Sequence, residues 1–200
     1  MKIISDVLYW ISTGLLVPVI VLLIFFFIRA LILIGTFFGQ YLDMRRTNTA
    51  LRKAISELKP GNVTELETSL PQKSNTLLSV YVKRLFDAKD DPVLVEKIID
   101  EYEIASERDM ELPKTLTKMG PMLGLMGTLI PMGPALVGLA NGDIASMAYN
   151  MQVAFATTVV GLFCSAVGFV TRQVKQRWYR NDMNDMEFVA GRINQEHELI

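Results

Sequence analysis

Cysteine and histidine are nearly absent from this sequence, which contains one of each among its 200 residues. One cysteine cannot form an internal disulfide, and one cysteine with one histidine cannot supply the ligand cluster of a zinc site. Charge is also scarce, because Asp, Glu, Lys and Arg make up 20% of the chain, against about 25% in an average globular protein. The formal net charge of −1 excludes a general nucleic-acid binder, which would be strongly basic.

The missing charge is concentrated in three long stretches. The first runs from Val7 to Ile28, the second lies between Lys118 and Asp143, and the third lies between Asp143 and Arg172. Each exceeds the roughly 20 residues that a helix needs to cross about 30 Å of hydrocarbon. Backbone groups inside lipid must bond within their own segment, so these stretches are expected to be helices. With a mean hydropathy of +0.30, the sequence predicts an all-α membrane protein in contact with lipid.

Basic residues flank the three stretches mainly on one side, and this bias sets the orientation in the membrane. The turn over residues 140–144 carries no basic residue, whereas basic residues follow the first and third stretches and precede the second. We therefore predict a multi-pass protein of the cytoplasmic (inner) membrane, with its N-terminus outside and its C-terminus in the cytoplasm. The predicted segments are an N-terminal segment with transmembrane helix 1 (1–42), a cytoplasmic helical insertion (43–118), transmembrane helix 2 (119–141), transmembrane helix 3 (144–171) and a cytoplasmic C-terminal helix (172–200).

The predicted insertion contains two local signals. Residues 59–62, Lys-Pro-Gly-Asn, are typical of a turn. Asp91 followed by Pro92 is typical of a helix start, with Asp as the N-cap and proline at the first helical position. That helix is expected to run to about Leu112, because Pro113 would interrupt it. The C-terminal helix is expected to continue the third span without a break.

Small residues and two threonines occupy one face of each of the last two spans. The small residues are Gly120, Gly124 and Gly127 in the second span and Ala154, Gly161 and Ser165 in the third. Such faces let helices pack closely, and ordinary packing remains an open interpretation of the glycines. Thr128 and Thr158 lie near the middle of their spans, so antiparallel helices place both hydroxyls near the bilayer midplane. Each hydroxyl could bond to its own backbone, or several copies could arrange these hydroxyls as a polar ring around a common axis.

Ionisable residues are missing from the interior of both spans. Between Met119 and Thr171 the only acidic residue is Asp143, and no Lys, Arg or His occurs. A proton path through a membrane normally needs an ionisable relay. Either the chain conducts no protons, or a partner brings the carboxylate. The same inventory argues against an intramembrane enzyme, so we predict no catalytic residue, no cofactor and no metal site.

Two motifs in these spans resemble those of a known family. Residues 120–128, GPMLGLMGT, resemble the signature that opens the second helix of TolQ and ExbB, and residues 156–163, ATTVVGLF, resemble the run in their following helix. The layout of three spans with one cytoplasmic insertion is also similar. On these motifs, over roughly residues 113–172, the chain is identified as a member of the MotA/TolQ/ExbB proton-channel family. The resemblance aligns Thr158 with the family's pore threonine, three residues before Gly161.

The resemblance implies a mechanism and partners. Five copies of the chain would form a homo-oligomeric ring around the membrane helices of two copies of a single-span protein of the ExbD, TolR or MotB kind. Each partner helix would carry one aspartate level with the threonines. Its protonation and release under the proton-motive force would rotate the ring relative to the partner dimer, whose outer domain passes the work to the cell envelope. Sodium is the alternative ion.

The sequence also departs from the family pattern. Val153 stands where TolQ and ExbB carry a glutamate, five residues before the pore threonine. Pro131 and Pro134 follow the Gly-Thr motif and are expected to kink the outer half of the second span. The sequence therefore leaves two functions open, a ring subunit of an ion-driven motor and a non-conducting membrane scaffold that packs through the same small residues.

Overall fold

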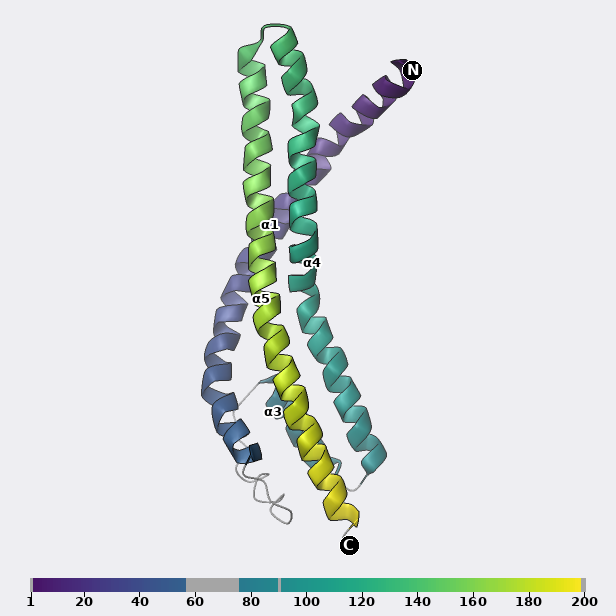
Figure 1. The fold of residues 1–200 in the computed structure, drawn as a ribbon, viewed down its shortest axis with the longest axis vertical. Coiled ribbons are helices and arrows are strands. Elements are labelled where there is room, and N and C mark those ends of the chain that lie inside the picture. The colour runs from purple at the N-terminus through teal and green to yellow at the C-terminus, as the bar shows by residue number, and fades with distance from the viewer. Residues whose placement is uncertain (1, 57–75, 90, 199–200) are drawn as a thin grey trace. The chain divides into compact units, whose positions relative to one another are not determined.

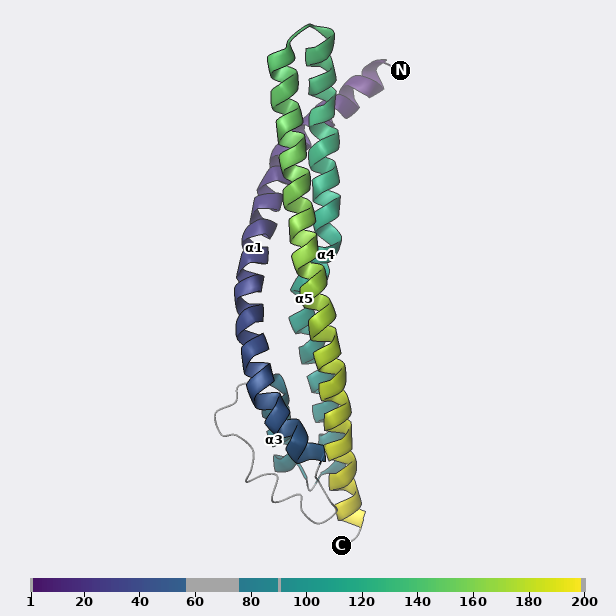
Figure 2. The ribbon, with the colours of Figure 1, turned by 60° about the vertical axis from the view of Figure 1, so that its left-hand side comes forward.

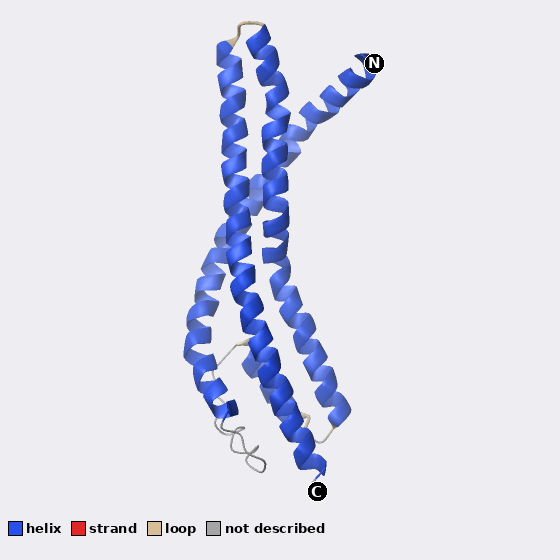
Figure 3. Cartoon of the chain, viewed as in Figure 1, coloured by secondary structure: helices blue, strands red, loops and turns tan. Residues whose placement is uncertain are grey.

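The computed structural model describes residues 2–56, 76–89 and 91–198. These residues form four helices and, within the described ranges, no strand (Figure 3). The helices are α1 (Lys2–Ser56), α3 (Leu77–Asp87), α4 (Pro92–Ala140) and α5 (Ile144–Glu198). The predicted all-α class is confirmed, whereas the turn predicted over residues 59–62 lies outside the described residues.

Three of these helices are long and apolar enough to cross a membrane. They are residues Val7–Leu42 of α1, which number 36, together with α4 and α5. α4 has 49 residues and α5 has 55, well beyond the roughly 20 that a bilayer requires. Each therefore combines an apolar stretch with a polar helical extension, and for α5 the sequence predicts this continuity. The orientation and the number of copies stay predictions.

The chain divides into two compact units, of which the first contains Met1–Ile34 and Leu112–Arg172. In this unit α4 and α5 lie side by side as a hairpin (Figures 1 and 2). Their connection turns at Gly142, whose φ of 75° suits a residue without a Cβ. α1 joins the hairpin through two apolar clusters. Their buried members are Val19, Leu23, Ala30 and Leu33 of α1, Leu116 and Leu123 of α4, and Cys164 of α5.

The second unit, Gly35–Glu111 with Gln173–Ile200, has a core of its own around Tyr102. The Tyr102 side chain is fully buried, and apolar residues of α3 and α5 pack in the same cluster. These are Leu78, Val82, Leu85 and Phe86 of α3 with Met186, Val189, Ala190 and Ile193 of α5. α3 is therefore an amphipathic helix that covers the packed extensions of α4 and α5. This helix was not predicted from the sequence.

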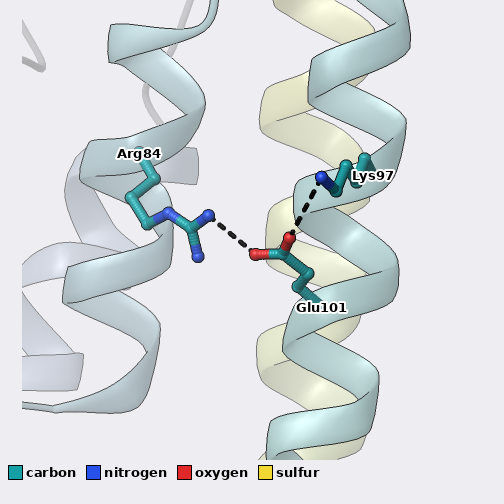
Figure 4. A network of polar contacts seen from close by, with 3 residues as sticks. All are labelled: Arg84, Lys97 and Glu101. Carbon is teal, nitrogen blue, oxygen red and sulfur yellow. Dashed lines mark hydrogen bonds and ion pairs between the residues drawn. The ribbon is translucent and has the colours of Figure 1, made fainter.

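Ion pairs connect the helices of the second unit. Arg84 of α3 lies 2.7 Å from Glu101 of α4, which also approaches Lys97 at 3.8 Å (Figure 4). These side chains are partly exposed, so the pairs contribute at most about 1 kcal/mol each. A more buried group joins α4 to α5, where Lys175 Nζ lies 2.6 Å from the Asp109 carboxylate and only 3% of the Lys175 side chain is exposed.

The start of α4 confirms one local prediction. The helix begins at Pro92. The Asp91 carboxylate accepts hydrogen bonds from the backbone N–H groups of Val93 at 3.0 Å and Leu94 at 3.2 Å. Asp91 therefore caps donors that have no partner within the helix.

The prediction that this helix ends near Leu112 is wrong. α4 passes through Pro113 and continues to Ala140. The fixed φ of proline is compatible with a helix, although proline costs one backbone hydrogen bond and its ring crowds the carbonyl four residues earlier. The Pro113 side chain is fully buried, and the Thr117 hydroxyl donates to the Pro113 carbonyl at 2.8 Å. Packing of the surrounding residues thus outweighs the local penalty of the proline.

Candidate ion-pathway site

The α4–α5 hairpin is held at very short range by its glycines. A Cβ built on Gly161 would lie 2.6 Å from the Gly120 carbonyl oxygen and 2.9 Å from the Gly124 Cα. A Cβ on Gly127 would lie 2.5 Å from the Thr157 hydroxyl oxygen. Only glycine allows two backbones to approach this closely. The small-residue faces therefore pack against each other within one chain.

The predicted pore-face residues fall on or beside this contact. Gly120, Gly124, Gly127, Ala154 and Gly161 are buried, and Ser165 is half-buried. The Ser165 hydroxyl donates to the Thr117 carbonyl of α4 at 3.0 Å. Their role in close helix packing is thus visible within the hairpin, whereas a role in lining a pore stays a prediction.

The hairpin brings the two predicted threonines to similar depth. A Cβ on Gly124 would lie 3.5 Å from the Thr158 Cα. Gly124 is one helical turn from Thr128 on α4. Thr158 therefore lies about one turn along the hairpin axis from Thr128.

Both threonines lie on the side of the hairpin away from α1. Ile130 of α4 and Val160 of α5 pack against the cluster that Val19 and Leu23 of α1 form with Leu123. Thr128 precedes Ile130 by two residues, and Thr158 precedes Val160 by two. Two residues correspond to about 200° of helix rotation, which carries each threonine to the opposite side of its helix.

Each hydroxyl donates to its own helix. Thr128 Oγ1 donates to the Leu125 carbonyl at 2.8 Å, and Thr158 Oγ1 donates to the Ala154 carbonyl at 3.1 Å. This back-bonding uses the single hydroxyl hydrogen and leaves the lone pairs of the oxygen to accept. The two residues are half-buried rather than enclosed. The site can therefore present hydrogen-bond acceptors, but it holds no charge.

The neighbouring Thr157 was not singled out from the sequence. Its side chain is 6% exposed and faces Gly127. Its hydroxyl donates to the Val153 and Ala154 carbonyls, at 3.0 and 2.9 Å. Both faces of a membrane helix can be apolar, so the sequence pattern does not show that Thr157 is packed and Thr158 is only half-buried.

The ends of the hairpin carry the nearest charges. Asp143 in the α4–α5 turn accepts a hydrogen bond from the Ser146 N–H at 3.0 Å and so caps α5. Among the described residues, no group of three or more His, Cys, Asp or Glu side chains is placed to hold a metal ion. The interior of the hairpin is therefore a neutral site lined by hydroxyls, carbonyls and apolar side chains.

Titratable groups meet instead in the second unit. The Tyr179 hydroxyl and Lys175 both bond the Asp109 carboxylate. Burial, the hydrogen bond to Asp109 and the charges of Asp109 and Asp182 raise the pKa of Tyr179 well above its ordinary value. Tyr179 thus stays neutral and donates its hydrogen at any physiological pH.

Residues 74–187 match the MotA/TolQ/ExbB proton channel family, which is more than half of the 200 residues. The match includes the hairpin with both threonines, and it also reaches α3 and most of the second unit's α5. No curated protein matched the chain. The chain therefore belongs to the MotA/TolQ/ExbB proton channel family, a family of membrane channel and motor subunits.

Proposed function

We propose that this chain is the ring-forming subunit of a proton-driven membrane motor, in which Thr128 and Thr158 line the ion path. The observation that carries the proposal is the pairing of these residues at similar depth on the hairpin side that α1 leaves uncovered. Family membership supports a proton-channel subunit. The five-copy ring, the single-span partner dimer, the N-outside orientation and the conversion of ion flow into envelope work belong to the proposal.

The proposed chemistry assigns the titrating group to the partner. Neither span of the hairpin contains a charged residue, so the chain cannot relay a proton at the midplane alone. A partner carboxylate there would be protonated more readily than in water, because burial disfavours its charged form. The neutral carboxyl group has one O–H to donate. The back-bonded hydroxyls of Thr128 and Thr158 offer the acceptors that such a donor requires.

A non-conducting scaffold is the alternative function. It is favoured by two observations, because the glycine faces are occupied within the hairpin and both hydroxyls already bond their own backbone. A scaffold would need neither hydroxyl for its activity. Valine substitution separates the two functions, since valine has nearly the shape of threonine but no hydroxyl.

The test measures proton flux through the assembly purified from its native membrane by a tag on this chain. The sample, with any single-span protein that it retains, is reconstituted into liposomes containing a pH-sensitive dye. T128V/T158V should reduce flux by about tenfold or more, the effect of about 1.4 kcal/mol on a rate-limiting step. T157V is the matched control, because it removes a hydroxyl at the same depth from the packed face, and it should retain flux.

Three results would contradict the proposal. Unchanged flux in T128V/T158V would remove the ion-path role, and equal losses in T157V would point to packing instead. A single-copy mass for the native assembly in detergent would exclude a ring. Repeating the measurement with a sodium gradient identifies the ion. If sodium crosses the membrane and protons do not, sodium replaces the proton as the driving ion in the proposal.

A further inference from the structure

We propose that Ser165 is a positioning residue, which holds α5 in register with α4 by bonding a backbone carbonyl that Pro121 has freed. This inference deepens the proposed function, and it rests on that function only where proton flux is the readout. The hydrogen bond itself lies entirely within the first unit, between the Ser165 hydroxyl and the Thr117 carbonyl at 3.0 Å.

Proline chemistry explains why this carbonyl is available. In an α-helix the carbonyl of each residue accepts from the N–H four residues later. Proline has no N–H, so Pro121 leaves Thr117 without that donor. α4 contains three other prolines, Pro113, Pro131 and Pro134. Their freed carbonyls belong to Asp109, Gly127 and Ile130. Among the residues that the structure describes, only the Thr117 carbonyl of these four receives a side-chain donor from another helix.

Serine in a helix usually bonds the carbonyl of its own preceding turn. Ser165 instead reaches across to α4, where the backbones are closest. A Cβ on Gly120 would lie 3.0 Å from the Ser165 nitrogen and 2.6 Å from the Gly161 carbonyl oxygen. A carbonyl that packs against another helix without finding a donor is costly, so the serine hydroxyl has a strong reason to stay in place.

The Ser165–Thr117 bond has the same helix register as the contact between Thr158 and Gly124. Thr158 lies seven residues before Ser165 on α5, and Gly124 lies seven residues after Thr117 on α4. Because the helices are antiparallel, the pair Ser165–Thr117 and the pair Thr158–Gly124 belong to one alignment. The second pair is in contact, with a Gly124 Cβ 3.5 Å from the Thr158 Cα. A bond two turns away thus fixes where Thr158 stands.

Selective labelling can observe the freed carbonyl directly. Thr117–Lys118 is the only Thr–Lys pair in the sequence. Carbonyl-¹³C threonine with ¹⁵N lysine therefore isolates the Thr117 carbonyl in solid-state NMR of the whole assembly. S165A should shift this resonance. In a second sample that carries ¹³C on glycine and threonine, S165A should weaken the ¹³C–¹³C magnetisation transfer between Gly124 and Thr158, whereas S165T and the control T128V should leave both signals unchanged. An unmoved Thr117 resonance in S165A overturns the proposal.

A double-mutant cycle tests the role of the proline. S165A should raise the equilibrium constant for unfolding by about 3- to 18-fold, the range for the loss of one interhelical hydrogen bond in a membrane. In P121A the new N–H can bond Thr117, so S165A should then have no effect. P134A is the matched control and should leave the S165A loss intact. If S165A lowers the stability equally with and without Pro121, the coupling is refuted. If P121A does not assemble, the NMR comparison of S165A with wild type decides the case.

Flux separates positioning from simple packing. S165A should lower proton flux by about threefold or more while the assembly persists, and S165T should restore it. A shifted Thr117 resonance with both the flux and the Gly124–Thr158 transfer unchanged means that the bond positions nothing and overturns the inference. If wild-type protein conducts no protons, the proposed function fails, and the Gly124–Thr158 transfer in S165A still decides whether Ser165 sets the register.

Discussion

The contact of Gly161 with α4 makes a quantitative prediction for the variant G161A. An alanine Cβ would lie 2.6 Å from the Gly120 carbonyl oxygen and 2.9 Å from the Gly124 Cα. Both are backbone atoms, so no side chain can rotate to make room, and the helices must separate. Overpacking of this kind costs about 1–3 kcal/mol, and the better helix propensity of alanine returns up to about 1 kcal/mol. We expect a net loss of about 1–2 kcal/mol, a factor of about 5–30 in the folding equilibrium.

The assay is reversible unfolding of the purified protein in mixed micelles with increasing SDS. G14A is the matched control, because Gly14 also lies in an apolar span and nothing stands within 4 Å of its Cβ position. G14A should be neutral or slightly stabilising, since it gains helix propensity without a clash. If G161A proves as stable as G14A, the close approach of α4 and α5 is not the packing that holds the hairpin.

Two further predictions concern the second unit. D91A removes the cap of the Val93 and Leu94 N–H groups and should cost about 1 kcal/mol, seen as faster hydrogen exchange in the first turn of α4 but not in α5. For Tyr179, the raised pKa means that stability contributed by its neutral form is complete below about pH 10, its ordinary pKa, and is lost as pH rises above that value. Unfolding of wild type and Y179F between pH 8 and 12 should show a steeper alkaline decline in wild type, and parallel curves would contradict the assignment.

Much of the membrane architecture can be predicted from the sequence because its signals are local. The charge-free stretches predict the three long apolar helices, and Asp91–Pro92 predicts where α4 begins. Thr128 and Thr158 lie near the middle of their stretches, and an antiparallel hairpin is enough to bring them to similar depth. These predictions need only the rise of a helix and the cost of a charge in lipid.

Other features depend on tertiary contacts that a sequence pattern does not contain. Pro113 is a helix breaker by propensity, yet buried packing carries α4 through it. Thr157 and Thr158 are 100° apart on α5, and only the position of Gly127 shows which one is packed. Ser165 resembles its small neighbours in sequence. Its distinct role emerges when the proline-freed carbonyl is found opposite it.

The glycine-bearing faces of α4 and α5 pack against each other within one chain, and this limits how copies could associate. Gly120, Gly124 and Gly161 are already covered by the same chain, so they cannot also bind a neighbouring copy without opening the hairpin. The surface that remains on the two spans is mostly large and apolar, with Leu125, Leu129, Phe155, Val159 and Leu162 exposed. In the proposed ring, contacts of these two spans with another copy or with a partner helix would use these side chains and the half-buried threonines. Glycine variants should therefore impair folding of the single chain, whereas variants of the large exposed residues should impair assembly and leave the hairpin intact.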